Sequence, residues 1–208
     1  MKILIKNGRI IDPANQIDTV GNLQIVDETI QPLSEDFQPD QVIDASNRVV
    51  CPGLVDLRTR LREPGEKHKG TIRSETHAAA AGGVTTVAIP PDTIPVIDSS
   101  AVVELIRHKA EVAGFAEVIP LGALTKGLEG EELSNMGGLK QTGCNTVSNA
   151  RKPIRNSLVM RRAMEYATTH DLTLFLHAED PWLSNGGCAH EGSISTRLGL
   201  PGIPDAAE

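Results

Sequence analysis

The first fifty residues alternate apolar and polar positions over short stretches. Residues 2–12, "KILIKNGRIID", alternate from the start and contain Asn7-Gly8, a dipeptide typical of tight turns between antiparallel strands. "GNLQIVDETIQPL" and "QVIDASNRVV" have the same pattern and are separated by polar, proline-containing connections. The pattern predicts a small β unit over residues 1–50, with a hairpin turn at Asn7-Gly8.

From residue 51 the pattern changes to strands that alternate with amphipathic helices. A Thr or Ser cap and Gly82-Gly83 bracket the first predicted helix, while Asp98 or Ser99 and Gly114 bracket the second. The expected strands are "VVCPGLVDL", "VTTVAIP", "AEVIPLGAL", "CNTVSNA" and "LTLFLHAED"; the expected helices are "TIRSETHAAAAGG", "IDSSAVVELIRHKAEVAG", "GEELSNMGGLKQTG" and "RNSLVMRRAMEYATTHD". Five βα steps predict an α/β fold with a parallel sheet covered by helices over residues 51–208.

The number of βα steps is too small for a closed eight-stranded barrel, which needs roughly 250 residues. The last residues read "GIPDAAE", and Pro204-Asp205 has the character of another helix start. We therefore expect a truncated barrel, with an open sheet as the alternative.

Composition excludes several classes of partner. The net charge is −7 and the aromatic residues are one tryptophan, one tyrosine and three phenylalanines, so neither nucleic acid nor an anionic membrane is an expected partner. No apolar run approaches the ~20 residues of a membrane span. The N-terminus lacks the features of a signal peptide, so we expect a cytoplasmic protein, and the three widely spaced cysteines are expected to be reduced thiols.

The segment "DLRTRLREPG", residues 56–65, carries the most unusual chemistry in the chain. Arg58 and Arg60 follow an apolar run that predicts a buried strand, and side chains two positions apart on a strand point to the same side. Two guanidinium groups about 7 Å apart repel by roughly 2 kcal/mol at an effective dielectric constant of about 20. They need anionic neighbours, unless they are simply solvated charges at a strand end, and three carboxylates are candidates: Glu63, Asp92 and Glu179.

Other candidate residues follow the later strands, because the chemistry of parallel α/β sheets lies beyond the carboxyl ends of the strands. These candidates are Arg62, Pro90 to Asp92, Thr125, Lys126, Asn149 to Lys152, His177, Glu179 and Asp180.

Long segments of the chain resemble the dihydroorotase family of the amidohydrolase superfamily. They are "CPGLVDLRTRLREPGEKHKGTIRSETHAAAAGGVTTVAIPPDTIPVID", "ALTKGLEGEELSNMGGLK", "HAED" and "HEGSISTRLGLPGIPDAAE". The resemblance implies a TIM-type (β/α) barrel truncated to about five βα units, preceded by a small N-terminal β-sandwich portion. It also implies a metal-dependent cyclic amide hydrolase that interconverts dihydroorotate and carbamoyl aspartate in pyrimidine biosynthesis.

The metal-binding positions that the resemblance implies depart from the family pattern. The family carries His-x-His after the first strand, where this chain has Arg58 and Arg60, and a permanently protonated guanidinium cannot ligate a cation. Asn149 stands where the family has an acidic ligand, and only His177 is retained. Because a catalytic zinc site needs about three protein ligands, we expect no metal cofactor. We hypothesise that the arginine pair and nearby carboxylates replace the charge of the metal.

Two further positions match those that hold the substrate carboxylate in the family. Arg62 is retained, whereas Asp92 in "PDT" replaces an asparagine and would repel an anionic substrate. No residue is assigned a catalytic role, and because no partner ligands are visible, we expect His177 to be a relic or a hydrogen-bonded structural histidine rather than an active ligand.

The resemblance therefore implies a dihydroorotase-like protein that has lost catalysis and acts as a structural partner of aspartate carbamoyltransferase, as inactive homologues of this family do. The alternative is an active cyclic amidohydrolase with an altered site, either zinc-dependent or metal-free, for which Asp92 and Asp180 are the candidate general bases. A truncated product without function is a third interpretation.

Overall fold

The computed structural model describes all 208 residues, which divide into two compact units, Met1–Gly53 and Leu54–Glu208. This division lies close to the expected change of pattern after residue 50. None of the helices combines the length and the apolar character that crossing a membrane requires.

The first unit is a five-stranded sheet in the order β3-β2-β1-β4, with β5 also paired to β1. β1 runs antiparallel to β2, and β4 and β5 run parallel to β1. The strands are β1 (Lys2–Asp12), β2 (Ile17–Val26), β3 (Thr29–Gln31), β4 (Gln41–Asp44) and β5 (Val49–Val50).

The hairpin turn expected at Asn7-Gly8 is wrong, because β1 continues through both residues. The turn to β2 lies at residues 13–16, and Asn7-Gly8 forms an irregularity in the β1–β2 register instead. Asn7 has a left-handed φ of 62° and donates its N–H to Asn22 Oδ1 at 3.0 Å. A Cβ atom on Gly8 would lie 2.6 Å from Val50 Cγ2. Close approach of the neighbouring strand thus explains the glycine, as at a bulge.

The second unit contains two three-stranded parallel sheets. The order is β6-β7-β8 in one and β11-β10-β9 in the other. The strands are β6 (Leu54–Asp56), β7 (Val84–Ile89), β8 (Glu117–Pro120), β9 (Gly122–Ala123), β10 (Thr146–Ser148) and β11 (Thr173–Phe175), followed by a separate parallel pair, β12 (Ala189–His190) and β13 (Gly202–Ile203). The expected strand "AEVIPLGAL" is therefore divided at Leu121, whose N–H donates to the Ile89 carbonyl at 3.0 Å.

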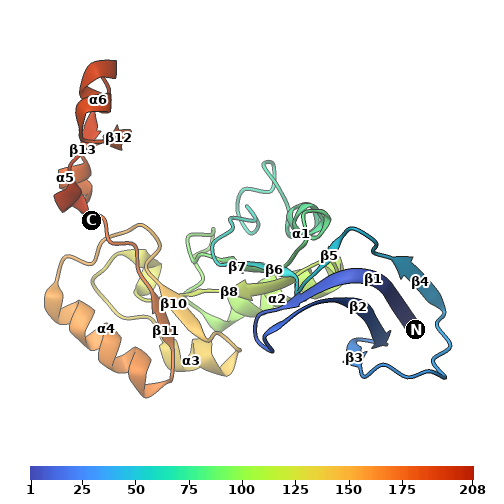
Figure 1. Ribbon diagram of the computed structural model, residues 1–208. Helices are drawn as coiled ribbons and strands as arrows, with labels where there is room; N and C mark the ends of the chain where they lie inside the picture. Colours follow the sequence, from blue (N-terminus) through green and yellow to red (C-terminus); the bar gives the residue numbers. More distant parts are fainter. The chain divides into compact units, whose positions relative to one another are not determined.

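Helices alternate with these strands, as the sequence predicts (Figure 1). They are α1 (Ile72–Ala81), α2 (Ser100–Ala113), α3 (Met136–Gln141), α4 (Ser157–Thr169), α5 (Pro181–Ser184) and α6 (Ser193–Leu198), with 3₁₀ turns η1 (Lys126–Leu128) and η2 (Asp205–Ala207). Thr71 and Ser99 are the N-cap residues of α1 and α2, and Gly114 ends α2 in a left-handed conformation. The third predicted helix is shortened to α3, because the Asn135 side chain accepts the Gly138 N–H and starts the helix there.

Each parallel sheet has its own hydrophobic core. In the first core, Val87 and Ile89 of β7 pack with Val103 and Ile106 of α2. The second core contains Val147 of β10 together with Leu124, Met136, Ala163, Ala167 and Leu172. Helices and strands thus both contribute to the buried apolar clusters that stabilise this unit.

The prediction of one buried strand before Arg58 is wrong. The apolar run is interrupted at residues 51–53, so that Val49–Val50 pairs in the first unit and only Leu54–Asp56 joins the second. Leu54 and Val55 are each 58% exposed. β6 is therefore a short edge strand with exposed apolar side chains.

Two adjacent residues of α2 test this description of the core. Ile106 is fully buried and Leu105 is 41% exposed. Ile106→Ala should lower the free energy of unfolding by about 2–5 kcal/mol, because it leaves a cavity, whereas Leu105→Ala should cost clearly less. Urea unfolding of both variants checks this, and equal losses would contradict the assigned helix face.

Candidate functional site

The loops that follow β6, β7, β10 and β11 carry most of the charged residues that the sequence singles out. Because the strands within each sheet are parallel, their carboxyl ends lie at the same end of that sheet. The ion pairs and hydrogen bonds of these loops determine which charges remain free to act on a ligand.

Arg60 is bound by Asp92. Its Nη2 and Nε both donate to Asp92 Oδ2, at 2.5 and 3.0 Å, and the two side chains are 38% and 28% exposed. An ion pair this accessible contributes at most about 1 kcal/mol to stability. The pair matters more for ligand binding than for stability, because the charge of Arg60 and the charge of Asp92 cancel each other.

Arg62 is also paired. Its Nη1 donates to Glu66 Oε2 at 3.0 Å, and its backbone has a left-handed φ of 64°. Hydrogen bonds from Lys69 and then Arg62 hold the pKa of Glu66 below its ordinary value. Arg62 and Arg60 line one small cavity of about 110 Å³ together with Asp92 and Glu66.

Glu63 does not face the arginines but is buried between the loop and the helices. Its carboxylate accepts hydrogen bonds from Lys109 Nζ at 2.6 Å and from the Ile72 N–H at 2.9 Å, with Lys67 Nζ at 3.5 Å. Burial, the largest influence, raises the pKa of Glu63, but the bonds from Lys109 and Ile72 and the charge of Lys109 together outweigh it. The pKa therefore lies below its ordinary value.

Arg58 is the arginine without a carboxylate partner in this loop. β6 ends at Asp56, so the strand alternation that would align Arg58 with Arg60 does not extend to them. Arg58 lines a different cavity, of about 390 Å³, with Ser148 and His177. The rest of its lining is Leu57, Pro90, Leu121, Ala150, Leu174, Phe175 and Leu176.

His177 is held by Glu179, the third expected counter-ion. The distance from His177 Nε2 to Glu179 Oε2 is 2.7 Å. Hydrogen bonds from His177 and then Ser184 lower the pKa of Glu179, so the carboxylate is ionised at neutral pH and Nε2 is the donor. All three carboxylates expected near the arginine pair are thus engaged, and only Asp92 bonds a member of it.

Asn149 fixes the loop after β10. It is buried, its Oδ1 accepts the Thr125 hydroxyl hydrogen at 2.6 Å, and its Nδ2 donates to the Lys152 carbonyl at 2.9 Å. Lys126 is paired with Glu132 at 2.5 Å. The side-chain amide of Asn149 therefore has a structural role here.

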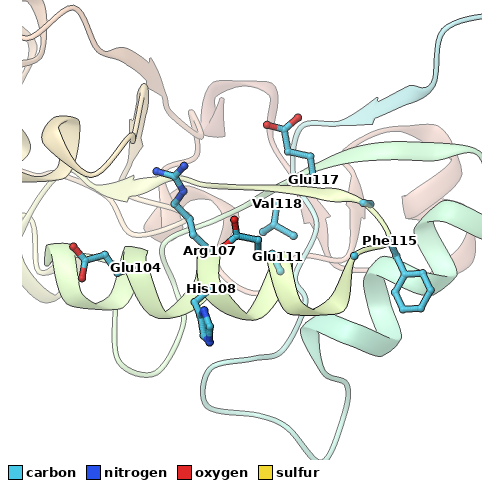
Figure 2. Close-up of a pocket in the computed structure, with 10 residues that line it drawn as sticks. Glu104, Arg107, His108, Glu111, Phe115, Glu117 and Val118 are labelled. Carbon is cyan, nitrogen blue, oxygen red and sulfur yellow. The ribbon is translucent and has the colours of Figure 1, made fainter. Parts of the chain in front are cut away.

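A separate hollow of about 600 Å³ lies along α2 and β8 (Figure 2). Glu104, Glu111 and Glu117 line it, and Arg107 donates from Nη1 to the Thr142 carbonyl at 2.7 Å. Glu117 is the first residue of β8, so this hollow lies at the amino end of the strand. It is not the end where parallel sheets carry their chemistry.

Comparison with known proteins identifies the family. The model of the dihydro-orotase-like family matches residues 47–208. The chain belongs to this family. Its dihydro-orotase-like sequence is 48% identical over 211 residues to a dihydroorotase-like protein of Pseudomonas putida, covering 100% of this chain and 50% of that protein. It is 47% identical over 210 residues to a dihydroorotase of Syntrophotalea carbinolica, covering 100% and 49%.

Solved structures show the same type of fold. L-hydantoinase from Arthrobacter aurescens superposes with a TM-score of 0.74 at 17% identity, over 88% of this chain and 42% of that one. D-hydantoinase from Thermus sp. gives 0.68 at 21% identity, over 88% and 42%. The α/β architecture is thus similar to that of the hydantoinase barrel. The dihydro-orotase-like chain spans about half the length of the curated relatives it matches.

The residues of this dihydro-orotase-like chain do not fit a zinc ion. No three His, Cys, Asp or Glu side chains converge anywhere in the structure. Arg58 and Arg60 have no lone pair to donate, Asn149 is bonded to Thr125 and Lys152, and His177 is bonded to Glu179. The donor set therefore differs from that of a catalytic zinc site.

Sequence reasoning missed Ser148 and Lys109. Ser148 ends β10 and lines the Arg58 cavity, and Lys109 lies on α2, far along the chain from its partner Glu63. The position of Ser148 at a strand end was an available signal, whereas the Lys109 contact depends on tertiary packing.

The pKa of Glu63 leads to a prediction with a defined pH dependence. Because this pKa is lowered in the folded state, the stabilisation is complete above the ordinary value of 4.5 and is lost as the pH falls through the folded pKa. Glu63→Gln should lower the free energy of unfolding by about 1–3 kcal/mol at neutral pH. The difference from wild type should shrink in acid.

Denaturant unfolding at several pH values measures this difference. Glu132→Gln, which removes an exposed ion pair with Lys126, is the matched control and should change stability by less than about 0.5 kcal/mol. A Glu63→Gln variant as stable as wild type at neutral pH would contradict the role assigned to the buried carboxylate.

Proposed function

We propose that this protein is a dihydroorotase-like protein of pyrimidine biosynthesis that lacks dihydroorotase activity and acts as a structural partner of aspartate carbamoyltransferase. The observation that carries the proposal is the Arg60–Asp92 ion pair. It occupies one position that the family resemblance assigns to a metal ligand and one that it assigns to substrate binding.

Residues 51–208 are, in this proposal, the N-terminal part of a (β/α) barrel of about five βα units, and residues 1–50 are a small β-sandwich portion. The parallel strand order and the likeness to hydantoinases support the first assignment. The first unit forms a single five-stranded sheet, which would be one layer of that sandwich. The proposed location is the cytoplasm, and no metal or organic cofactor is proposed.

The chemistry of the site supports the absence of turnover. Hydrolysis of a cyclic amide needs an activated water and a general base. Asp92 is paired with Arg60, and Asp180 caps α5 by accepting the Trp182 and Leu183 N–H groups at 2.8 and 3.1 Å. Both candidate bases are therefore engaged in other contacts.

The structural role follows from what the chain retains. An interface needs shape and surface charge rather than a metal ion, and a fold can persist after its chemistry is lost. The helices and strands expected from the sequence form two apolar cores, and none of the residues in these cores is a charged residue of the strand-end loops. Aspartate carbamoyltransferase is the partner that the family resemblance implies.

The alternative is an active zinc-dependent cyclic amidohydrolase with an altered site. The observation that favours it is that a relative 47% identical to this chain carries the name dihydroorotase. In that case metal ligands would come from residues other than Arg58 and Arg60, and His177 would leave Glu179.

One preparation distinguishes the two. We expect the purified protein to contain substoichiometric zinc and to show no hydrolysis of dihydroorotate, with or without aspartate carbamoyltransferase, and to elute with the transferase as a larger assembly on gel filtration. The Syntrophotalea carbinolica dihydroorotase, assayed in parallel, is the matched control. Stoichiometric zinc with metal-dependent turnover would establish the alternative, and separate elution would refute the partnership.

A further inference from the structure

The cavity beside Arg58 has the features of a binding site for an anion. Its volume of about 390 Å³ lies within the range of sites for small organic molecules. Its lining combines apolar side chains with three polar ones, Arg58, Ser148 and His177. These three residues come from the loop after β6, the end of β10 and the loop after β11, so three separate segments of the chain bring polar groups to the same cavity.

Charge balance separates Arg58 from its neighbours. Arg60 is matched by Asp92 and Arg62 by Glu66, whereas no carboxylate lies within 4.0 Å of the Arg58 guanidinium. Arg58 is exposed, so its charge attracts an anion mainly at short range, where the guanidinium can donate hydrogen bonds directly to it.

Ser148 provides a second, independent indication of a ligand. Its side chain is buried, with 5% exposed, and lines this cavity. Ser148 Oγ accepts the Ala150 N–H at 3.0 Å, but its own hydroxyl hydrogen donates to no acceptor of the protein. Buried donors are normally satisfied, so this hydrogen is available to an acceptor in the cavity.

The nearest carboxylate does not oppose an anion there. Glu179 is not among the residues that line the cavity, and its charge is engaged by the Nε2–H of His177 and by Ser184. His177 thus contributes part of the wall while its hydrogen-bonded edge is directed to Glu179.

We infer that this cavity binds a small carboxylate with an apolar body, held by the Arg58 guanidinium and the Ser148 hydroxyl. A carboxylate matches the planar fork of a guanidinium with two parallel hydrogen bonds, and the apolar lining accommodates the rest of the molecule. In this inference, the position that the family resemblance assigns to a metal ligand, Arg58, binds an anion instead of a cation. This inference does not depend on the association with aspartate carbamoyltransferase.

Benzoate and benzamide form a matched pair of probes, because they have the same shape and differ in charge. Calorimetric titration of the purified protein should detect benzoate binding and clearly weaker benzamide binding. Arg58→Ala should weaken benzoate binding about tenfold or more, the range for a hydrogen bond to a charged group. Arg58→Lys, which keeps the charge but loses the fork, should give an intermediate affinity.

Arg197→Ala is the control variant, because Arg197 is an exposed arginine of α6 that forms no ion pair, and it should bind benzoate as wild type does. Circular dichroism and the unfolding midpoint show whether each variant is folded. The inference is overturned if wild type does not bind benzoate, if benzamide binds equally well, or if both Arg58 variants bind benzoate as tightly as wild type.

Discussion

The buried carboxylate of Glu63 is the contact that joins the loop after β6 to the helices of the second unit. It joins the loop after β6 to the first turn of α1 through the Ile72 N–H and to α2 through Lys109. Breaking a buried ion pair by removing one partner is strongly destabilising, because it leaves an uncompensated charge. This single side chain thus links the end of the arginine-bearing loop to both helices.

With the loop held in place, the distribution of carboxylates decides what each arginine can do. Asp92 and Glu66 neutralise Arg60 and Arg62 within the protein, and these pairs need no ligand to balance their charge. The loop leaves Arg58 on the wall of another cavity, with His177 turned to Glu179. The same segment therefore contains two arginines that carboxylates of the protein neutralise and one arginine without such a partner, a difference that charge counting along the sequence does not reveal.

The sequence predicted the alternation of strands and helices and the caps at Thr71 and Ser99, because these depend on local periodicity and hydrogen bonding. It failed at Asn7-Gly8, where the close approach of Val50 places a register irregularity instead of a turn. The sequence also did not predict the orientation of Arg58 and Arg60 correctly. The strand ends at Asp56, so the rule that side chains alternate no longer applies two residues later.

The apolar residues that stabilise this unit are separate from the charged residues that line the cavities at the strand ends. The two apolar cores and the Glu63 network lie behind the strand ends, whereas Arg60 and Asp92 are partly exposed and contribute at most about 1 kcal/mol. An arginine at such a position costs little stability if a carboxylate lies opposite it. Asp92 meets that condition for Arg60. Arg58 has no such partner, so its exposed guanidinium is balanced by solvent ions and remains open to an anion that enters the cavity.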